Sequence, residues 1–438
     1  MNAPAALSGS DLGSRTMRRI TRRIIPFLFL LYLVAYLDRV NVSFAALDMT
    51  RELGLTPQAF GFGAGIFFFG YFLLEIPGAL IVESWSARKW IARIMITWGV
   101  LAAATGLIQN ATQFFTIRFC LGLAEAGFFP GMIVYLSHWY RGVDRAKAVS
   151  TFMIAIPMSE IIGAPISAYL MKLHWLGLAG WRWLLILEGL PAVILGVVTL
   201  FYLTDRPEDA KWLPDDEREW IAGELRRENA ARGGHSHQFW KGLTDSRVLL
   251  LLCGYFSLMN LSYAIIMWLP KILQAAYGKS IFTTTLLTSV PFLIGTPIIL
   301  WIGWHSDRTG ERPWHCAIPL LLGAGALLAF QAGTVPVGVA IALFAIGVTG
   351  MQSAKGPFWA IATTLLSGKA AAASVGLINS FGNLGGFAGP YAVGWLTSHS
   401  EGFGAGLLYM VGSSVAAAGL VLLAGWRARK SAVTRGRD

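Results

Sequence analysis

Apolar stretches of about 20 residues, the length at which a helix crosses the hydrocarbon core of a bilayer, recur along almost the whole chain. Short polar segments separate them. We predict a transmembrane helix in each of twelve stretches, at residues 24–44, 58–82, 91–109, 114–140, 146–170, 183–203, 247–269, 282–303, 315–333, 337–364, 371–397 and 403–426. A helix satisfies its own backbone hydrogen bonds in lipid. The pattern therefore predicts an all-α integral membrane protein whose outer surface contacts the lipid bilayer.

Composition supports the membrane assignment and changes how the net charge is interpreted. Of the 438 residues, 55% are hydrophobic and only 13% are charged, whereas a soluble domain carries roughly 25% charged residues. A net charge of +11 in a soluble protein would suggest a nucleic-acid partner. Here the cations flank apolar spans and act as topology signals, so no nucleic-acid partner is expected.

The distribution of Lys and Arg predicts the orientation of the chain. If the N-terminus is cytoplasmic, the loops on the opposite side hold only five of the 35 Lys and Arg residues, namely Arg51, Lys172, Arg182, Lys271 and Lys279. Cytoplasmic loops of membrane proteins carry an excess of these residues. We therefore expect a multi-pass membrane protein with both termini in the cytoplasm. The arginine-rich start before the first span resembles a secretory signal, but the many spans that follow indicate an uncleaved helix.

One long polar segment divides the chain into two halves. It covers residues 204–246, so we predict an N-terminal six-helix bundle at 1–203, a cytoplasmic linker, and a C-terminal six-helix bundle at 247–438. Within the linker, residues 214–227 begin with acids and end with bases, which suits the helix dipole and predicts a short amphipathic helix. The halves repeat each other, because residues 303–312 after the eighth span match 79–88 after the second. Such repeats are typical of transporters, which bind substrate between the two halves.

Several motifs carry a resemblance to a known family. Residues 303–312 have the pattern G-x-x-x-D-R-x-G-x-R and resemble the loop signature of the major facilitator superfamily, with a degenerate copy at 79–88. Stretches at 36–41, 122–131, 204–207 and 378–386 resemble its anion:cation symporter family, and in detail bacterial permeases of tartrate and related organic acids.

That resemblance implies two pseudo-symmetric six-helix bundles that alternate between inward-open and outward-open states. It also implies a monomer that uses the proton as its coupling ion and needs no cofactor. The residues that it assigns to gating are Glu83, Arg88, Asp307, Arg308 and Arg312.

Ionisable residues inside the predicted spans are the strongest functional signal. A charge at the bilayer centre costs at least roughly 2.5–3.5 kcal/mol, so it persists only when it is paired, hydrated or functional. Three cations lie more than two residues inside a span, namely Arg39, Arg118 and Lys355. The five acids are Asp38, Glu75, Glu125, Glu160 and Glu188.

Two of these helices carry an acid together with a base. Asp38 and Arg39 are adjacent, so their side chains project about 100° apart, whereas Arg118 and Glu125 are two turns apart on one helix face. The four residues could form buried salt bridges that only lock the helix packing. We favour a site for an anion and a titratable acid, because the arginine fork binds a carboxylate through two hydrogen bonds.

The family resemblance assigns roles to these residues. It implies that Arg39 and Tyr71 contact the substrate and that Asp38 and Glu125 carry protons. It also implies that Arg118 is the partner of Glu125.

The second half contributes further candidates for substrate binding. Lys355 precedes the Gly356-Pro357 pair that breaks the tenth span, as Pro130-Gly131 breaks the fourth, and broken backbone in a membrane lines a cavity. Lys355 is expected to add positive charge to the site, although it could instead extend to the cytoplasmic interface. The second half also carries neutral hydrogen-bonding groups that could bind the substrate, namely Asn379, Ser380 and Asn383. These groups could equally form hydrogen bonds between helices.

Three acids receive no direct role in substrate binding. We assign Glu75 and Glu188 mainly to structure, whereas the sequence assigns no role to Glu160 and suggests only that it could pair with a cation.

The residues favour a secondary active transporter over an enzyme. No nucleophile–base set or phosphate loop is present in the sequence, and its Cys and His residues show no metal-ligand spacing. We predict proton-coupled symport of a small organic anion, such as a tartrate-like dicarboxylate, a hydroxy acid or a sugar acid. One alternative is a facilitator or efflux carrier of a neutral or aromatic solute. Another is a non-transporting membrane sensor, which would normally carry an added signalling domain.

Overall fold

A computed structural model describes residues 9–231, 246–365 and 371–435, and every regular element within these ranges is helical. The helices of the first half are α1 (Gly9–Glu52), α2 (Pro57–Ser84), α3 (Ala87–Thr105), α4 (Ala111–Glu125), α5 (Phe128–Ser137), α6 (Gly142–Met153), α7 (Ala155–Leu170) and α8 (Gly180–Tyr202). A short 3-10 turn, η1 (Trp175–Gly177), lies between α7 and α8. Polar flanks extend some helices beyond the apolar spans from which they were predicted.

The second half repeats this arrangement after a linker. The linker holds η2 (Pro207–Asp209) and the helix α9 (Asp215–Ala231). The helices that follow are α11 (Ser246–Tyr277), α12 (Ile281–Thr309), α13 (Pro313–Gln331), α14 (Val337–Ser353), α15 (Lys355–Leu365), α16 (Ala371–Asn383), α17 (Gly385–Ser398) and α18 (Gly404–Arg435). Ten helical segments of the described residues are long and apolar enough to cross a membrane. With α3 and the α16–α17 pair they make the twelve predicted spans.

Prolines explain where three spans are interrupted. A proline in a helix clashes with the carbonyl four residues earlier and removes one hydrogen bond. The fourth span breaks between α4 and α5, where Gly127 adopts a left-handed φ of 84° just before Pro130. The tenth span breaks at Ala354, before Pro357, and the fifth at Ile154, before Pro157. The predicted breaks in the fourth and tenth spans are confirmed, and each lies about one turn before its proline.

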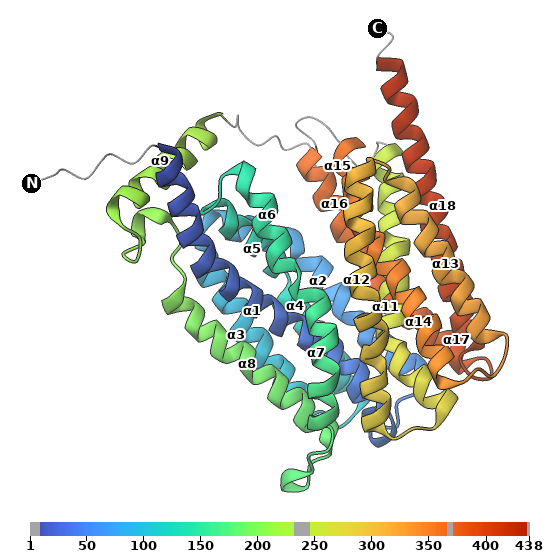
Figure 1. Ribbon diagram of the computed structural model, residues 1–438. Coiled ribbons are helices and arrows are strands. Elements are labelled where there is room, and N and C mark those ends of the chain that lie inside the picture. Colours follow the sequence, from blue (N-terminus) through green and yellow to red (C-terminus); the bar gives the residue numbers. More distant parts are fainter. Residues whose placement is uncertain (1–8, 232–245, 366–370, 436–438) are drawn as a thin grey trace, which may run out of the picture.

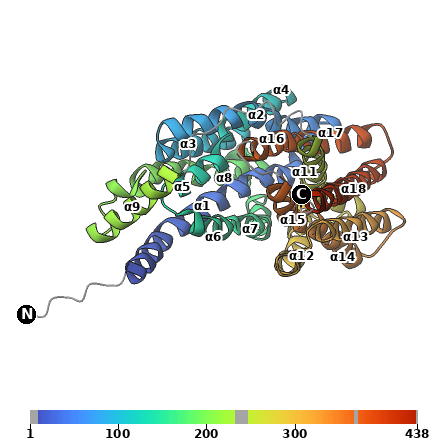
Figure 2. The same ribbon diagram turned by 90° about the horizontal axis from the view of Figure 1, so that it is seen from above.

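The helices form two bundles that lie side by side (Figures 1 and 2), one built from α1 to α8 and the other from α11 to α18. The main contacts between the bundles join α2 to α17 and α7 to α12. Glycines allow the backbones of α2 and α17 to approach closely. A Cβ atom added at Gly61 would lie 2.3 Å from the Pro390 carbonyl oxygen, and one at Gly65 would lie 2.8 Å from that of Phe387.

Contacts between the bundles are dense at the end remote from both termini. There the Gln58 amide donates to Ser398 Oγ at 3.0 Å, and Lys271 Nζ donates to Thr50 Oγ1 at 2.8 Å. Figure 1 shows the bundles converging at this end and spreading apart toward the side that holds the termini and α9. The described conformation is therefore closed on the remote side.

The linker helix α9 packs on the first bundle. Both Arg15 and Arg19 of α1 form ion pairs with the buried Glu217 carboxylate, at 2.8 and 3.0 Å. The apolar face of α9 is buried through Ile221 and Leu225. The linker helix is thus attached to one bundle by both charge and apolar contacts.

The charge distribution generates a test of orientation. In a background whose three native cysteines are replaced, Asp209→Cys lies on the terminus side and Ser400→Cys on the remote side, and both positions are exposed. We expect an impermeant maleimide applied to intact cells to label Ser400→Cys alone, because the cation-rich side remains in the cytoplasm. Both variants should react after permeabilisation. Labelling of Asp209→Cys in intact cells would reverse the assigned orientation.

Candidate functional site

Arg39 of α1 lies at the centre of a polar cluster between the two bundles. Its guanidinium forms an ion pair with Glu125, the last residue of α4 before the break. It also donates to the hydroxyl of Tyr263, on α11 of the second bundle, at 3.5 Å. The Glu125 side chain is buried, but that of Arg39 remains 14% exposed. The pair therefore combines a buried acid with an arginine that solvent can reach.

Aromatic rings surround the Arg39 guanidinium, and one of its nitrogen atoms lacks a hydrogen-bond partner in the described part of the structure. It lies over the rings of Tyr36, Phe67 and Tyr71 at 4.9–5.7 Å from their centroids. The buried Nε atom of Arg39 has no hydrogen-bond partner among the described residues. An arginine has five N–H donors in a fixed fork. Arg39 thus retains donor capacity for another acceptor.

Asp38 and Arg118 occupy a buried layer beside this pair. The Asp38 carboxylate accepts hydrogen bonds from Trp98 Nε1 on α3 and from Asn41 Nδ2, the latter at 2.9 Å. Arg118 donates to the Ala64 carbonyl at 3.4 Å and is attracted to Asp38. These contacts connect α1, α2, α3 and α4 within the first bundle.

The pairing that the resemblance implied for Glu125 is wrong in this conformation. Its ion-pair partner is Arg39 rather than Arg118. Arg118 shares a helix face with Glu125, but seven residues separate the two along the axis by roughly 10 Å. Arg39 lies on a different helix, α1, which can place it at the same depth in the bundle as Glu125. The seven-residue spacing within α4 keeps Arg118 at a different depth.

The second polar cluster joins the bundles through Glu75. Its carboxylate accepts a hydrogen bond from Asn379 Nδ2 on α16 at 2.5 Å, and Ser380 and Asn383 of the same helix lie nearby. The three predicted neutral residues therefore gather around an acid that was assigned mainly to structure. The sequence did contain a signal that Glu75 belongs to the interface. Glu75 follows the predicted substrate-binding residue Tyr71 by one helical turn, so both lie on the same face of α2.

Lys355 and Glu160 form a third polar group across the interface. Lys355 begins α15 directly after the break and donates to Gln352 Oε1 at 2.5 Å. The buried Glu160 carboxylate of α7 attracts the lysine, although no ion pair within 4.0 Å joins these two residues. The expectation that Lys355 adds positive charge to a cavity stays a prediction. Glu188 accepts from Ser167 Oγ at 2.9 Å between α7 and α8, and it lies near Asn41, which donates to Asp38.

The predicted gating residues lie at the terminus side, and their contacts differ between the halves. In the first half, the Arg88 amide donates to the Asp205 carboxylate at 2.9 Å. In the second, Asp307 is exposed and pairs with Arg312 of its own loop, and Arg308 lies over the Trp304 ring. In this conformation the ion pair of Asp307 is therefore within its own loop, and its assignment to gating stays a prediction. The side chain of Glu83 lies outside the described part of the structure.

Comparison with known proteins identifies the family. The model of the Major Facilitator Superfamily matches residues 28–390. An Agrobacterium vitis protein named as a candidate tartrate transporter is 47% identical over 94% of this chain and 95% of its own length. A quinolone resistance transporter of Acinetobacter baumannii is 37% identical over 94% and 95%.

Solved structures agree on the fold. An inward-facing, unoccupied bacterial homologue of the human lysosomal transporter Spinster has a TM-score of 0.76 at 17% identity, covering 94% of this chain and 98% of that one. The chain belongs to the major facilitator superfamily, and it is a multi-pass membrane protein with the twelve-helix, two-bundle fold of that family.

The geometry of Arg39 generates a test of carboxylate recognition. Arg39→Lys keeps the charge but removes the planar fork, so we expect binding of an organic anion to weaken by about 1–3 kcal/mol, the contribution of a charged hydrogen bond. Equilibrium binding to purified protein measures this change. Arg93→Lys, at a cation that stacks on Trp90 outside the cluster, is the control and should bind normally. Native affinity in Arg39→Lys would identify Arg39 as a structural counter-ion.

The contacts of Asp307 generate a test of gating. A contact made in one conformation changes the equilibrium between conformations without touching the ligand. We expect Asp307→Ala to slow substrate exchange by roughly tenfold, about 1.4 kcal/mol, with little change in binding affinity. The exposed acid Glu401 lies near the remote end of the second bundle, so Glu401→Ala should alter neither quantity. Lost binding with an unchanged exchange rate would contradict the assignment.

Proposed function

We propose that this protein imports a small organic anion together with a proton across the bacterial inner membrane, by alternating access of the site between its bundles. Its membership of a transporter superfamily and its 47% identity to a candidate tartrate transporter support transport of an organic anion. We further propose that Arg39 is the substrate-binding cation and Glu125 the proton acceptor. Both termini, and the side on which the bundles spread apart, would face the cytoplasm.

The single observation that carries the mechanism is the Arg39–Glu125 ion pair at the bundle interface. The Arg39 side chain is partly exposed, so an incoming carboxylate can approach it. A substrate carboxylate and the Glu125 carboxylate would compete for the same fork. Because Glu125 is buried, it cannot exchange the lost arginine for water.

Proton coupling follows from that competition. A buried carboxylate without a partner is strongly disfavoured in its ionised form. When the anion takes Arg39, Glu125 loses its cation and gains a negative neighbour, so proton binding becomes more favourable. By thermodynamic linkage, protonation of Glu125 strengthens anion binding to the same extent. The loaded site then carries less uncompensated charge, which lowers the free energy needed to close the bundles around it.

Asp38 is the second candidate for proton transfer. It lies next to Arg39 in sequence and is buried within the first bundle, where Trp98 and Asn41 donate to it. A change in the position of Arg39 or Arg118 on substrate binding would alter the charge that compensates Asp38. We therefore propose that it responds to the substrate through these arginines.

The groups that face the interface favour a substrate with two anionic or polar ends. Arg39 and Tyr71 belong to the first bundle, whereas Lys355 and the amides of Asn379 and Asn383 belong to the second. A dicarboxylate could bind a cation of each bundle, and its hydroxyls could bind the neutral groups. A sugar acid presents one carboxylate and several hydroxyls, so it fits the same set. Binding to both bundles at once would couple occupancy to their movement.

A second candidate function is export of an aromatic solute. The relative named as a quinolone resistance transporter favours it, as do the rings around Arg39 and the contact of Phe68 with Tyr263 at 4.2 Å between centroids. An aromatic acid could stack on these rings while its carboxylate binds Arg39. Counterflow with a panel of tartrate-like, sugar-derived and aromatic acids in proteoliposomes separates these candidates. Binding without counterflow of any acid would favour a sensor.

The proposed coupling predicts the behaviour of neutral variants. Glu125→Gln should still bind and exchange substrate but should lose accumulation driven by a pH gradient, because it cannot release a proton. Asp38→Asn should also lose driven uptake, with weakened binding because Arg39 is adjacent. The two readouts are counterflow and pH-driven uptake in the same proteoliposomes.

Glu52→Gln is the matched control, since it neutralises an acid of the same bundle that pairs with Arg182 at 2.9 Å, at the remote end of α1 and away from Asp38 and Arg39. It should retain driven uptake if it folds normally. Continued accumulation of substrate by both Glu125→Gln and Asp38→Asn would falsify proton coupling through these residues.

A further inference from the structure

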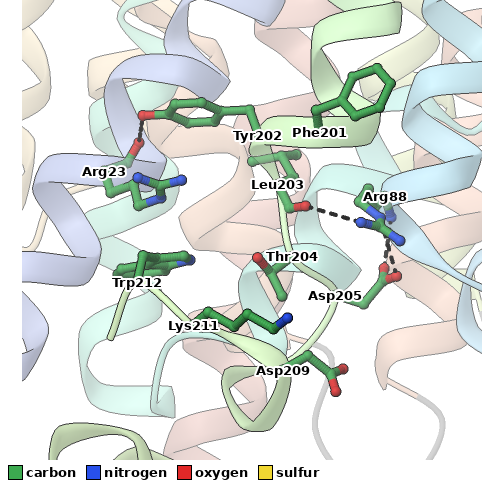
Figure 3. A pocket seen from close by; sticks show the side chains of 10 residues that line it. All are labelled: Arg23, Arg88, Phe201, Tyr202, Leu203, Thr204, Asp205, Asp209, Lys211 and Trp212. Atoms are coloured by element: carbon green, nitrogen blue, oxygen red, sulfur yellow. Dashed lines mark hydrogen bonds and ion pairs between the residues drawn. The ribbon is translucent and has the colours of Figure 1, made fainter. Parts of the chain in front are cut away.

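A cavity of about 400 Å³ lies on the first bundle, at the end that carries the termini, and is separate from the polar cluster around Arg39. Residues of α1, α3 and α8 line it together with the start of the linker (Figure 3). Its lining contains three cations, Arg23, Arg88 and Lys211, and two acids, Asp205 and Asp209. The cavity therefore has a net positive lining.

The position of the cavity corresponds to the boundary between lipid tails and headgroups. The apolar helix α8 ends at Tyr202, and the polar linker begins directly after it. Phe201, which also lines the cavity, is 84% exposed in the last turn of α8. A lone exposed phenylalanine at the end of a transmembrane helix contacts lipid. Tyr and Trp are enriched at this depth, and Tyr202 and Trp212 both belong to the lining.

Arg23 is held in place by aromatic rings. Its guanidinium lies between Tyr202 and Trp212, at 4.6 and 4.8 Å from the two ring centroids (Figure 3). The Tyr202 hydroxyl donates to the Arg23 carbonyl at 3.2 Å, which ties α8 to α1. An arginine fixed in this way has lost the conformational freedom of a surface side chain, so binding an anion costs less entropy.

Two of the three cations have no acidic partner. Among the described residues, no carboxylate lies within 4.0 Å of the charged groups of Arg23 or Lys211. Arg88 differs, because it contacts Asp205 at 3.7 Å and donates to the Leu200 carbonyl at 3.2 Å. Asp205 is occupied by Arg88 and by Ser86 Oγ at 2.7 Å. The charges available to a ligand are thus those of Arg23 and Lys211, with Asp209 as the one remaining acid.

We propose that this cavity binds the phosphate group of an anionic phospholipid, with Arg23 and Lys211 holding the phosphate and an acyl chain lying over Phe201. Arginine and lysine are the side chains that bind phosphate most strongly, and basic pockets beside transmembrane helices bind anionic headgroups. The bound lipid would join α1, α8 and the linker segment that leads into α9. It would therefore stabilise the attachment of the linker to the first bundle. The proposal does not depend on the transported substrate.

The experiment compares lipid binding by the full-length protein and by matched variants. Purified protein is titrated with phosphatidylglycerol or phosphatidylcholine, and bound lipid is counted by native mass spectrometry while thermal unfolding is followed in parallel. We expect one phosphatidylglycerol to bind above the phosphatidylcholine background and to raise the unfolding temperature. Arg23→Gln/Lys211→Gln should weaken that binding by roughly tenfold or more, the loss of at least one charged hydrogen bond.

The matched control is Arg22→Gln/Arg206→Gln, which removes two exposed cations from the same segments but not from the lining. It should bind phosphatidylglycerol normally, and an equal loss in both double variants would overturn the proposal in favour of diffuse charge attraction. If the double variant does not fold, Lys211→Gln alone gives the same comparison with Arg206→Gln.

Phe201→Ala and inorganic phosphate distinguish a lipid from a soluble anion. Phe201→Ala keeps every charge, so it should weaken binding of phosphatidylglycerol but not of phosphate. Inorganic phosphate at millimolar concentration should raise the unfolding temperature less than the lipid does. Equal stabilisation by phosphate, together with normal lipid binding by Phe201→Ala, would overturn the lipid assignment and identify a site for a soluble phosphate.

Discussion

An ionised side chain inside a bilayer needs a partner, and this constraint governs how the two bundles meet. Arg39 pairs with Glu125 within the first bundle and donates to Tyr263 of the second. One carboxylate oxygen of Glu75 accepts from Asn379 across the interface. Each contact depends on the relative position of the helices that carry it, so movement of the bundles must redistribute charge. A ligand that supplies or removes one charge changes which arrangement of the bundles is stable.

The interface between the two bundles has an apolar part and a polar part. At the remote end, close backbone packing of α2 on α17 through Gly61 and Gly65 leaves no room for a side chain. Such packing depends on backbone approach and is insensitive to protonation. Midway along the helices, hydrogen bonds and ion pairs replace it, and these respond to protons and to anions. The backbone packing at the remote end holds the bundles together on that side. The polar contacts midway along the helices can change when a proton or an anion occupies the site.

The linker shows how charge also organises the terminus side. Glu217 is buried between Arg15 and Arg19, so α9 stays with α1. The segment that precedes α9 forms the positive cavity beside Arg23. One end of the first bundle therefore combines an internal ion-pair network with cations that remain available to an external anion. The two sets of cations differ because the linker places Glu217 within reach of Arg15 and Arg19, whereas among the described residues it places no carboxylate within 4.0 Å of the Arg23 guanidinium.

Apolar stretches of about 20 residues predicted the twelve spans, because insertion of a helix in lipid depends on local composition. The long polar linker and the internal repeat predicted the division into two halves. The Pro130-Gly131 and Gly356-Pro357 pairs predicted the broken fourth and tenth spans, since the clash of a proline with the preceding turn is local. The ion-pair and hydrogen-bond partners of the polar residues were not determined by the local sequence. Glu125 pairs with Arg39 across two helices rather than with Arg118 on its own, Asn379 turns to Glu75, and Asp307 turns back to Arg312. Only the tertiary structure decided these pairings, because they depend on the height and rotation of neighbouring helices, which the spacing within one helix does not define.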